Sequence, residues 1–335
     1  MFEPRYRLTP HLLKLIEQAA ILTTKIAHTK ISFSLKVRLE KEALDRSVHA
    51  STSIEGNELS LGQVAALNER REVAAEFKEK QEVINYTRAM QWIIKNSTAE
   101  INEAGLLRLH KIITDKLLDQ EKSGAYKSIQ NRVVNEKRVV VFVPPTPAQA
   151  PKMTKELLAW LKEQKDEHPV IVSALFHHQL VTIHPFADGN GRVARAAANW
   201  ILYRSGFDPK HIYYLDEYFA KDRQRYYQKI QQARDLDHDL TYWIEYVAEG
   251  VQATLGTVFK RIQELSLKAD EHLVVTPKQE ELIGLIRKEG SIGSGDIGKH
   301  LKINRARVNQ LIVPLIEAGI VKKEGKARAT RYYLA

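Results

Sequence analysis

Apolar residues recur at helical spacing along most of the first 270 positions of the chain. Thr9-Pro10 has the form of a helix N-cap followed by proline, and an apolar stripe with intervals of three and four residues follows it. Gly56-Asn57 is a stop signal after the second such stretch. The pattern predicts a mainly helical protein. The predicted helical stretches start at residue 10 and continue over 31–53, 72–95, 152–165, 169–182, 190–204 and 215–267.

One short segment interrupts the helical pattern. Val133-Val134 and the apolar run at 139–143 are separated by Asn135-Glu136-Lys137, and Pro144-Pro145 ends the second run. Two short β-type runs around a polar turn are typical of a hairpin. We therefore predict two antiparallel strands here, within an otherwise helical region.

A second pattern begins near the C-terminus. Apolar periodicity breaks at residues 268–276, and Thr276-Pro277 opens a new helix, which indicates a domain boundary. The elements that follow are a helix at 295–301, a turn through Asn304, a helix at 305–318 and two wing strands at 320–321 and 332–334. This order predicts a winged helix-turn-helix domain over residues 270–335. The remainder divides into an N-terminal helical region, 1–100, and a second helical region, 101–267.

Composition adds exclusions and locates the charge. The 335 residues include 51 Lys plus Arg, 41 Asp plus Glu and no cysteine, for a formal charge of +10. Without cysteine, disulfides, thiolate zinc sites and cysteine nucleophiles are excluded, and we expect a cytoplasmic protein. No apolar run is long enough to span a membrane, and the N-terminus does not look like a secretory signal. Residues 276–335 alone hold an excess of six positive charges, which suggests DNA as a partner for this segment.

The stretch with the most chemistry is 184–195, HPFADGNGRVAR, which follows one predicted helix and opens the next. Gly189 and Gly191 let the backbone turn tightly and direct successive amide hydrogens to one point, where the next helix adds its positive end. Arg192 and Arg195 are three residues apart, so both reach the same face of that helix. The arrangement predicts a polyphosphate site.

Two further side chains in this stretch suit a transfer reaction on a phosphate. Asp188 is a hard oxygen ligand beside the anion site and could hold a hydrated Mg²⁺. His184, next to the rigid Pro185, could take a proton from an attacking hydroxyl. Singly, each of these residues has an ordinary structural explanation, but twelve consecutive positions that combine them favour a functional site. A zinc site of His177, His178 and His184 lacks the spacing typical of metallopeptidases, and the chain has no Walker-type phosphate loop.

This stretch resembles the signature of the Fic family, H-x-F-x-[DE]-G-N-G-R-x-x-R, at every fixed position. The resemblance implies a helical Fic fold and a nucleotidyltransferase that moves AMP from ATP to a Ser, Thr or Tyr hydroxyl of a target protein. It implies His184 as general base, Asp188 as Mg²⁺ ligand and Phe186 as a core anchor for the loop. The implied ATP-binding residues are Gly189, Asn190 and Gly191 at the α- and β-phosphates, Arg192 at the β-phosphate and Arg195 at the γ-phosphate.

The resemblance extends to the predicted hairpin. Residues 123–127, SGAYK, followed by the hairpin look like the family's flap, which clamps the target's main chain as an added strand. Lys127 stands where the family often has Arg. The implied target-docking residues are Val139, Val140, Val141 and Phe142. The similarity covers most of residues 1–265, and it is compatible with a homodimer.

Residues 51–56, STSIEG, match the family's inhibitory pattern, [ST]-x-x-x-E-[GN]. Ser51 and Glu55 lie four apart and share a helical face, and Gly56 can end the helix. The resemblance implies that Glu55 pairs with Arg195 and so misaligns ATP for transfer. Three alternatives stay open: Glu55 supports removal of AMP at the same site, the site transfers another phosphate-containing group, or the chain is a DNA-binding regulator whose Fic core senses a nucleotide.

Overall fold

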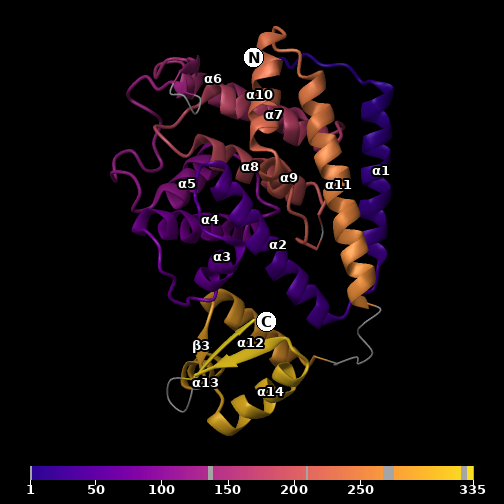
Figure 1. Cartoon of the computed structure of the whole chain (residues 1–335), viewed down its shortest axis with the longest axis vertical. Helices are drawn as coiled ribbons and strands as arrows, with labels where there is room; N and C mark the ends of the chain where they lie inside the picture. The colour runs from indigo at the N-terminus through magenta and orange to yellow at the C-terminus, as the bar shows by residue number, and fades with distance from the viewer. Residues whose placement is uncertain (1, 135–138, 209, 267–274, 326–329, 335) are drawn as a thin grey trace.

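The chain folds into a large helical body and a small C-terminal domain (Figure 1). The computed structural model describes residues 2–134, 139–208, 210–266, 275–325 and 330–334. The prediction of a mainly helical protein is confirmed. The helices of the body are α1 (Pro10–His28), α2 (Phe33–Ile54), α3 (Leu61–Asn68), α4 (Phe77–Lys95), α5 (Glu103–Thr114), α6 (Ala150–Glu163), α7 (Pro169–Ile183), α8 (Asn190–Arg204), α9 (Asp216–Lys221), α10 (Arg223–Asp235) and α11 (Thr241–Ser266).

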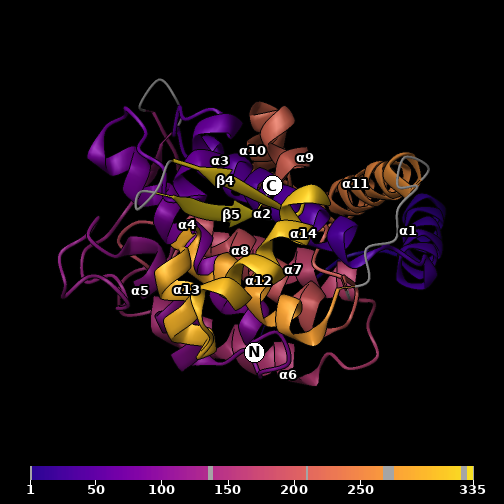
Figure 2. The same cartoon turned by 90° about the horizontal axis from the view of Figure 1, so that it is seen from below.

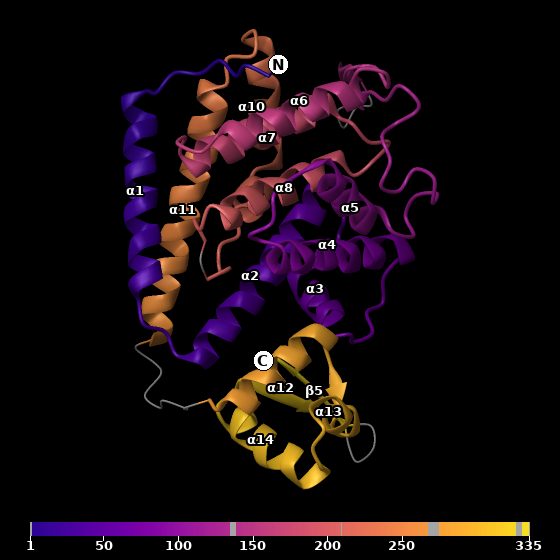
Figure 3. The same ribbon diagram turned by 180° about the vertical axis from the view of Figure 1, so that it is seen from behind.

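Helices α7 and α8 lie at the centre of the body. Helix α7 is apolar nearly all round, and twelve of its fifteen residues are buried. Helix α8 is buried over most of its length as well, and its small residues Ala194, Ala196 and Ala197 are fully buried. The long helices α1 and α11 pack side by side along one edge (Figure 3). The loop between α7 and α8 is therefore held by the most buried part of the fold.

Several helices differ from the sequence prediction. The stretch predicted at 215–267 is three helices, because the Asp222 side chain accepts a hydrogen bond from the Arg225 N–H and starts α10 anew. Helices α3 and α5 were not predicted. Helix α3 has only eight residues, too few for a clear apolar period, although Ser60 and Gln63 form a capping box at its start. Helix α4 begins at Phe77 and not at residue 72.

The predicted hairpin is present. Strand β1 (Val133–Val134) pairs antiparallel with β2 (Val140–Phe142), and Val133 lies opposite Phe142. Most of the predicted turn, 135–138, lies outside the described residues. Val139, Val140 and Val141 are all exposed, so the hairpin presents apolar side chains to solvent.

The C-terminal domain has the element order predicted for a winged helix-turn-helix. Its elements are α12 (Pro277–Glu289), β3 (Ile292–Gly293), α13 (Ser294–Leu301), α14 (Arg305–Glu317), β4 (Val321–Glu324) and β5 (Arg331–Leu334). The sheet is antiparallel in the order β3-β5-β4. Strand β3 was not predicted because it is only two residues long. Thr276 and Gln279 form a capping box at the start of α12, as the Thr-Pro signal indicated.

Helix α2 joins the two parts of the molecule. It runs from the C-terminal domain into the centre of the body (Figures 1 and 2). At its start, Val37 belongs to the hydrophobic core of the C-terminal domain, and Phe33 packs against that core. Glu40 accepts a 2.6 Å salt bridge from Arg287 of α12. The helix that carries the predicted inhibitory residues therefore also carries the docking surface for the C-terminal domain.

The close approach of the C-terminal domain to the helical body at Asn68 depends on one glycine. Gly290 ends α12 with φ +69°, and a β-carbon there would lie 2.6 Å from the backbone oxygen of Asn68. Both the backbone angle and the space favour glycine. None of the helices in the described ranges is both long and apolar enough to cross a membrane.

Candidate active site

The 184–195 stretch forms the loop after α7 and the first turns of α8. His184 ends α7 in the left-handed conformation, with φ +51° and ψ +57°, and Pro185 prevents the helix from continuing. Gly189, with φ +77°, then turns the chain into α8. Phe186 between them is fully buried, as the resemblance implied. The loop thus has two fixed ends and an apolar anchor.

The His184 ring is oriented for proton acceptance. Its Nδ1 lies 3.1 Å from the backbone oxygen of Val181. Because a carbonyl only accepts, Nδ1 carries the hydrogen, and the lone pair stays on Nε2. Burial lowers the pKa of His184 to about 4, helped by the positive charges of Lys127 and Arg234, while Glu55 raises it. At neutral pH the ring is therefore an uncharged imidazole with a free acceptor.

The Asn190 side chain closes the loop through both ends of its amide. Its Oδ1 accepts from the Phe186 N–H at 2.9 Å, and its Nδ2 donates to the Phe186 oxygen, also at 2.9 Å. Both ends of the amide are thus used to close the loop, and the side chain is 3% exposed. The Nδ2 group carries a second hydrogen, so the implied contact of this side chain with phosphate stays a prediction. The backbone of Gly189, Asn190 and Gly191 at the start of α8 is placed to contribute amide hydrogens to a phosphate as well.

Arg195 is buried and held by several hydrogen bonds. Its guanidinium donates from Nε to Ser51 Oγ at 2.8 Å and from Nη2 to the Ser51 oxygen at 2.8 Å. Asp216 lies 3.8 Å away and is itself held by Ser47 and Asn199. Burial opposes a positive charge here, but Glu55, Asp216 and two tyrosines outweigh it and raise the Arg195 pKa well above its usual range. Arg195 therefore keeps its charge and its position.

Glu55 occupies the anion site. Its Oε1 accepts from Arg195 Nη2 at 2.7 Å, and a β-carbon at Gly191 would overlap the same carboxylate. Burial disfavours the ionised form of Glu55, but the charges of Arg195 and Arg192 outweigh burial and lower its pKa. The ionised carboxylate of α2 therefore sits over the start of α8, where a phosphate oxygen would bind.

The helix-end geometry around Glu55 follows from the sequence. Helix α2 ends at Ile54, Glu55 is its C-cap, and Gly56 leaves the helix with φ +95°. The Tyr227 hydroxyl donates to the Ile54 oxygen at 3.1 Å and ties this end to α10. Ser51 is fully buried and Glu55 is partly exposed. The three predicted inhibitory residues therefore lie together at the loop.

Arg192 has a partner that the sequence did not indicate. Its Nη1 lies 3.3 Å from the Glu82 carboxylate of α4, and its Nη2 lies 3.5 Å from Asp188. Glu82 is buried and also accepts from the Asn57 side chain at 2.9 Å. Nothing in the local sequence marks Glu82, because it is 110 positions from Arg192 and has no motif of its own. The pair fixes the second arginine beside the loop.

Two guanidinium nitrogens point to a missing anion. Arg195 Nη1 and Arg192 Nε are buried, and neither has a hydrogen-bond partner among the described residues. Arg195 Nη1 lies close to Gly191, at the start of α8. Buried donors without acceptors are costly, and an anion at the loop would satisfy them.

Asp188 fits a hydrated metal ion that is shared with phosphate oxygens. Its side chain is 62% exposed and sits at the open side of the loop. Within the described ranges, no three His, Asp or Glu side chains come together as a metal-binding group. A single carboxylate with phosphate and water ligands is the usual arrangement for Mg²⁺. The donor set therefore suits Mg²⁺ that arrives with a nucleotide.

His110, a buried histidine that the sequence did not indicate, packs against the loop. The His110 ring of α5 stacks on Phe186 at 3.9 Å, its Nδ1 accepts from the Gly124 N–H at 2.9 Å, and its Nε2 lies 3.1 Å from the Asp188 oxygen. Burial lowers its pKa to about 4, so it is neutral, with the hydrogen on Nε2. His110 connects the loop with the segment that leads to the hairpin.

The predicted flap is attached directly to the loop. The Lys127 N–H donates to the Pro185 oxygen at 2.9 Å, and the Asn131 side chain donates to the Phe186 oxygen at 2.9 Å. On the other side, the Arg234 guanidinium lies 3.8 Å from the centre of the Phe142 ring. The four predicted docking residues therefore lie on a hairpin whose leading segment is bonded to the loop and whose Phe142 contacts α10.

Known proteins are similar to this chain in sequence and fold. Residues 100–202 match the Fic/DOC family. The chain is 30% identical over 278 residues to a protein adenylyltransferase Fic of Aedes aegypti, a match that covers 79% of this chain and 52% of that protein. A crystal structure of a Fic family protein from Desulfovibrio desulfuricans superposes with a TM-score of 0.68 at 26% identity and covers 100% of this chain and 98% of that one.

A second solved structure, Fic-1 of Caenorhabditis elegans, has a TM-score of 0.65 at 27% identity and covers 76% of this chain and 73% of that one. The chain spans about half the length of the curated relatives it matches. The Fic signature, the helical architecture around it and these matches lead to the same conclusion: the chain contains a Fic domain of the Fic/DOC family over residues 100–202.

Proposed function

We propose that this chain is a protein adenylyltransferase that moves AMP from ATP to a Ser, Thr or Tyr hydroxyl of a target protein. One observation carries the proposal. The loop between α7 and α8 places neutral His184, whose Nε2 can accept a proton, next to Arg192 and Arg195, which are fixed by their own contacts and can bind phosphates. Relatives named as protein adenylyltransferases support the same reaction.

The reaction assigns a task to each group. The target hydroxyl oxygen attacks the α-phosphorus, the bond from that phosphorus to the bridging oxygen of the β-phosphate breaks, and pyrophosphate leaves. His184 accepts the hydroxyl proton on Nε2. Backbone amides at Gly189 to Gly191 hold phosphate oxygens, Arg192 holds the β-phosphate and Arg195 the γ-phosphate. Mg²⁺ bound by Asp188 supplies positive charge to the phosphates when present.

Glu55 acts as a brake in this proposal. Its carboxylate takes the Arg195 hydrogen bond and the space above Gly191 that the γ-phosphate needs. A nucleotide bound beside it has its α-phosphate out of line for attack. Ser51 acts with Glu55, because it accepts two hydrogen bonds from the same guanidinium and keeps α2 in place.

The flap positions the target. Val139, Val140 and Val141 are exposed on this hairpin, and an extended segment of the target can add as a strand beside it. Main-chain pairing of this kind suits many sequences, so the target is selected by more than the flap. A homodimer and a cytoplasmic location stay predictions of the sequence.

The group transferred can be tested without knowledge of the target. The Glu55→Gly protein is incubated with Mg²⁺ and ATP labelled at the α- or the γ-phosphate, and self-modification is followed on gels and by intact mass. Adenylylation predicts label from the α position only and a mass increase of one AMP. Label from the γ position would show transfer of a phosphoryl group and contradict the proposal.

DNA is a second candidate partner, for residues 276–335. Helix α14 lies on the side of the C-terminal domain away from the body (Figures 1 and 3), and Arg305 and Arg307 at its start are exposed. Lys322 and Lys323 of β4 are exposed as well. Arg331 instead donates to Ser291 at 2.8 Å, and Lys326 and Arg328 of the predicted wing lie outside the described residues. The exposed cations suit phosphate contacts.

Salt dependence distinguishes DNA contact from a protein-docking role. If the full chain binds duplex DNA through α14, Arg305→Ala with Arg307→Ala lowers the slope of log affinity against log salt by about 2. Lys14→Ala with Lys78→Ala removes the same charge from exposed sites on the body and leaves the slope unchanged. Equal slopes for the two double variants, or no retention on DNA at low salt, would contradict DNA binding through this helix.

A further inference from the structure

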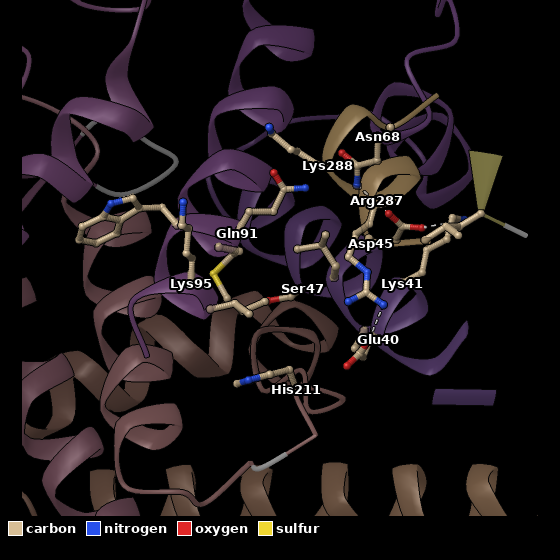
Figure 4. Close-up of a pocket in the computed structure, with 18 of the residues that line it drawn as sticks. Glu40, Lys41, Asp45, Ser47, Asn68, Gln91, Lys95, His211, Arg287 and Lys288 are labelled. Carbon is tan, nitrogen blue, oxygen red and sulfur yellow. Dashed lines mark hydrogen bonds and ion pairs between the residues drawn. The ribbon is translucent and has the colours of Figure 1, made fainter. Parts of the chain in front are cut away.

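A cavity of about 540 Å³ lies between the helical body and the C-terminal domain, away from the catalytic loop (Figure 4). The body contributes α2 and α4, and the domain contributes α12 and the end of β5. The volume falls in the range of small-molecule sites. Its largest apolar lining residues are Leu44, Met90, Trp92, Ile94, Ile286 and Leu334.

Most charged side chains that line the cavity form ion pairs, but two lysines do not. Arg287 is paired with Glu40 at 2.6 Å, and Lys41 with Glu69 at 2.9 Å and with Asp45 at 3.4 Å. Lys95 and Lys288 have no ion-pair partner in the part of the chain that the structure describes, and both are exposed. Figure 4 shows Lys95, Lys288 and Gln91 in one part of the lining, and the paired Lys41 and Arg287 in another. The cavity thus combines an apolar interior with a positive mouth.

Two buried polar atoms of the lining residues are left without partners. The Tyr213 hydroxyl has no hydrogen bond among the described residues, although Tyr213 is only 2% exposed. His211 Nδ1 is in the same situation. Buried polar groups are usually hydrogen-bonded, so these two atoms can each take a partner. A ligand with an oxygen-bearing head could supply one.

We propose that this cavity binds a compact apolar carboxylate, with its apolar body between α2, α4 and α12 and its charge near Lys95 and Lys288. The apolar part of the lining favours a ligand with an apolar body over a highly charged nucleotide, and the unpaired lysines favour an anion over a cation. Since the ligand would touch both the body and the C-terminal domain, its binding would also stabilise their contact.

Gly284 of α12 provides a way to fill the cavity without a clash. It lines the cavity, and a β-carbon there would have no heavy atom within 4 Å. Gly256 of α11 has the same free surroundings but lies outside the cavity. Phenylalanine at either position removes a helical glycine, so the two variants are matched in their effect on helix propensity.

Decanoate is the probe, with binding measured by calorimetry and by the shift in melting temperature of the full chain. We expect one site per chain, with affinity reduced about tenfold or more by Gly284→Phe and unchanged by Gly256→Phe. Decyltrimethylammonium has the same chain and the opposite charge, and it should bind at least about tenfold more weakly than decanoate.

A second pair of variants keeps the proposal testable if Gly284→Phe does not fold. Lys95→Ala with Lys288→Ala should weaken decanoate binding but not the binding of decanol, which has no charge. The proposal is overturned if decanoate does not bind, if several molecules bind without saturation, if the ammonium binds equally well, or if binding survives both the cavity-filling and the lysine variants. None of these readouts depends on transferase activity.

Discussion

Replacing Glu55 with glycine is expected to raise the rate of AMP transfer by roughly five- to 150-fold, the range of an inhibitory coupling of ~1–3 kcal/mol. The physical reason is the position of the carboxylate: it accepts from Arg195 at 2.7 Å and fills the space above Gly191. Without the Glu55 carboxylate, the Arg195 hydrogen bond and the space above Gly191 are both available to the γ-phosphate. The measurement is the initial rate of transfer from ATP labelled at the α-phosphate.

The remaining contacts of Arg195 explain why we expect Glu55→Gly to raise the transfer rate and not to disrupt the site. Ser51 still accepts two hydrogen bonds from the guanidinium, and the buried Asp216 still lies 3.8 Å away. The arginine therefore stays charged and in place when Glu55 is lost. Glu55 is a C-cap residue with φ −87°, outside the helix proper, so glycine at this position costs little helix stability.

Two control variants test whether loss of the Glu55 carboxylate is what raises the transfer rate. Glu58→Gly removes an exposed carboxylate three residues away and should leave the rate unchanged. Glu55→Gln keeps the size and one acceptor but loses the charge, and we expect an intermediate rate. If Glu55→Gly transfers no faster than the wild-type protein, Glu55 is not a brake, whatever its distance from Arg195.

The alternative role of Glu55, in removal of AMP, needs a different substrate. Target that already carries AMP is incubated with wild-type protein and with Glu55→Gly, and released AMP is measured. A carboxylate that positions a water predicts release by the wild type and none by the variant. Equal release from both, or none from either, leaves Glu55 with the inhibitory role alone.

The sequence predicted the parts of the site that are local in the chain. The loop from His184 to Arg195 is a continuous motif, so its backbone turn, its anion-binding amides and its two arginines follow from adjacent residues. The Ser51 to Gly56 segment is equally local. Their meeting across 140 positions came from the family resemblance, because periodicity carries no information about which helices pack together.

Residues that support the site from a distance were missed for the same reason. Glu82, His110 and Asp216 have no motif around them, yet each is buried and bonded to the loop or its arginines. Asn190 shows the opposite case: the motif named the residue, but its two bonds to Phe186 show that the amide closes the loop. A motif identifies positions, whereas the task of each side chain depends on its partners.

Loss of the His184 side chain is the second large effect, and two substitutions separate chemistry from folding. His184 has φ +51°, so alanine there adds backbone strain, whereas asparagine adopts this conformation readily. Neither can accept the hydroxyl proton. We expect both variants to lose about 10²- to 10⁴-fold in rate, to the point of no detectable transfer. The asparagine variant should keep the wild-type melting temperature.

An exposed helix histidine, His28, provides the control. His28→Ala should change neither the transfer rate nor the melting temperature. Activity in the asparagine variant would exclude His184 as the base.

The pH profile tests the same assignment in the intact protein. An ordinary histidine has a pKa of 6.5, but burial and the charges of Lys127 and Arg234 hold that of His184 at about 4. A base works only when unprotonated, so kcat/KM for the activated Glu55→Gln protein should stay level as the pH falls through 6.5 and decline only towards 4. In the wild type, ionised Glu55 raises the His184 pKa, and its loss lowers that pKa further, so the Gln variant gives the cleaner profile. A decline centred at 6.5 would contradict a base with the lowered pKa of His184.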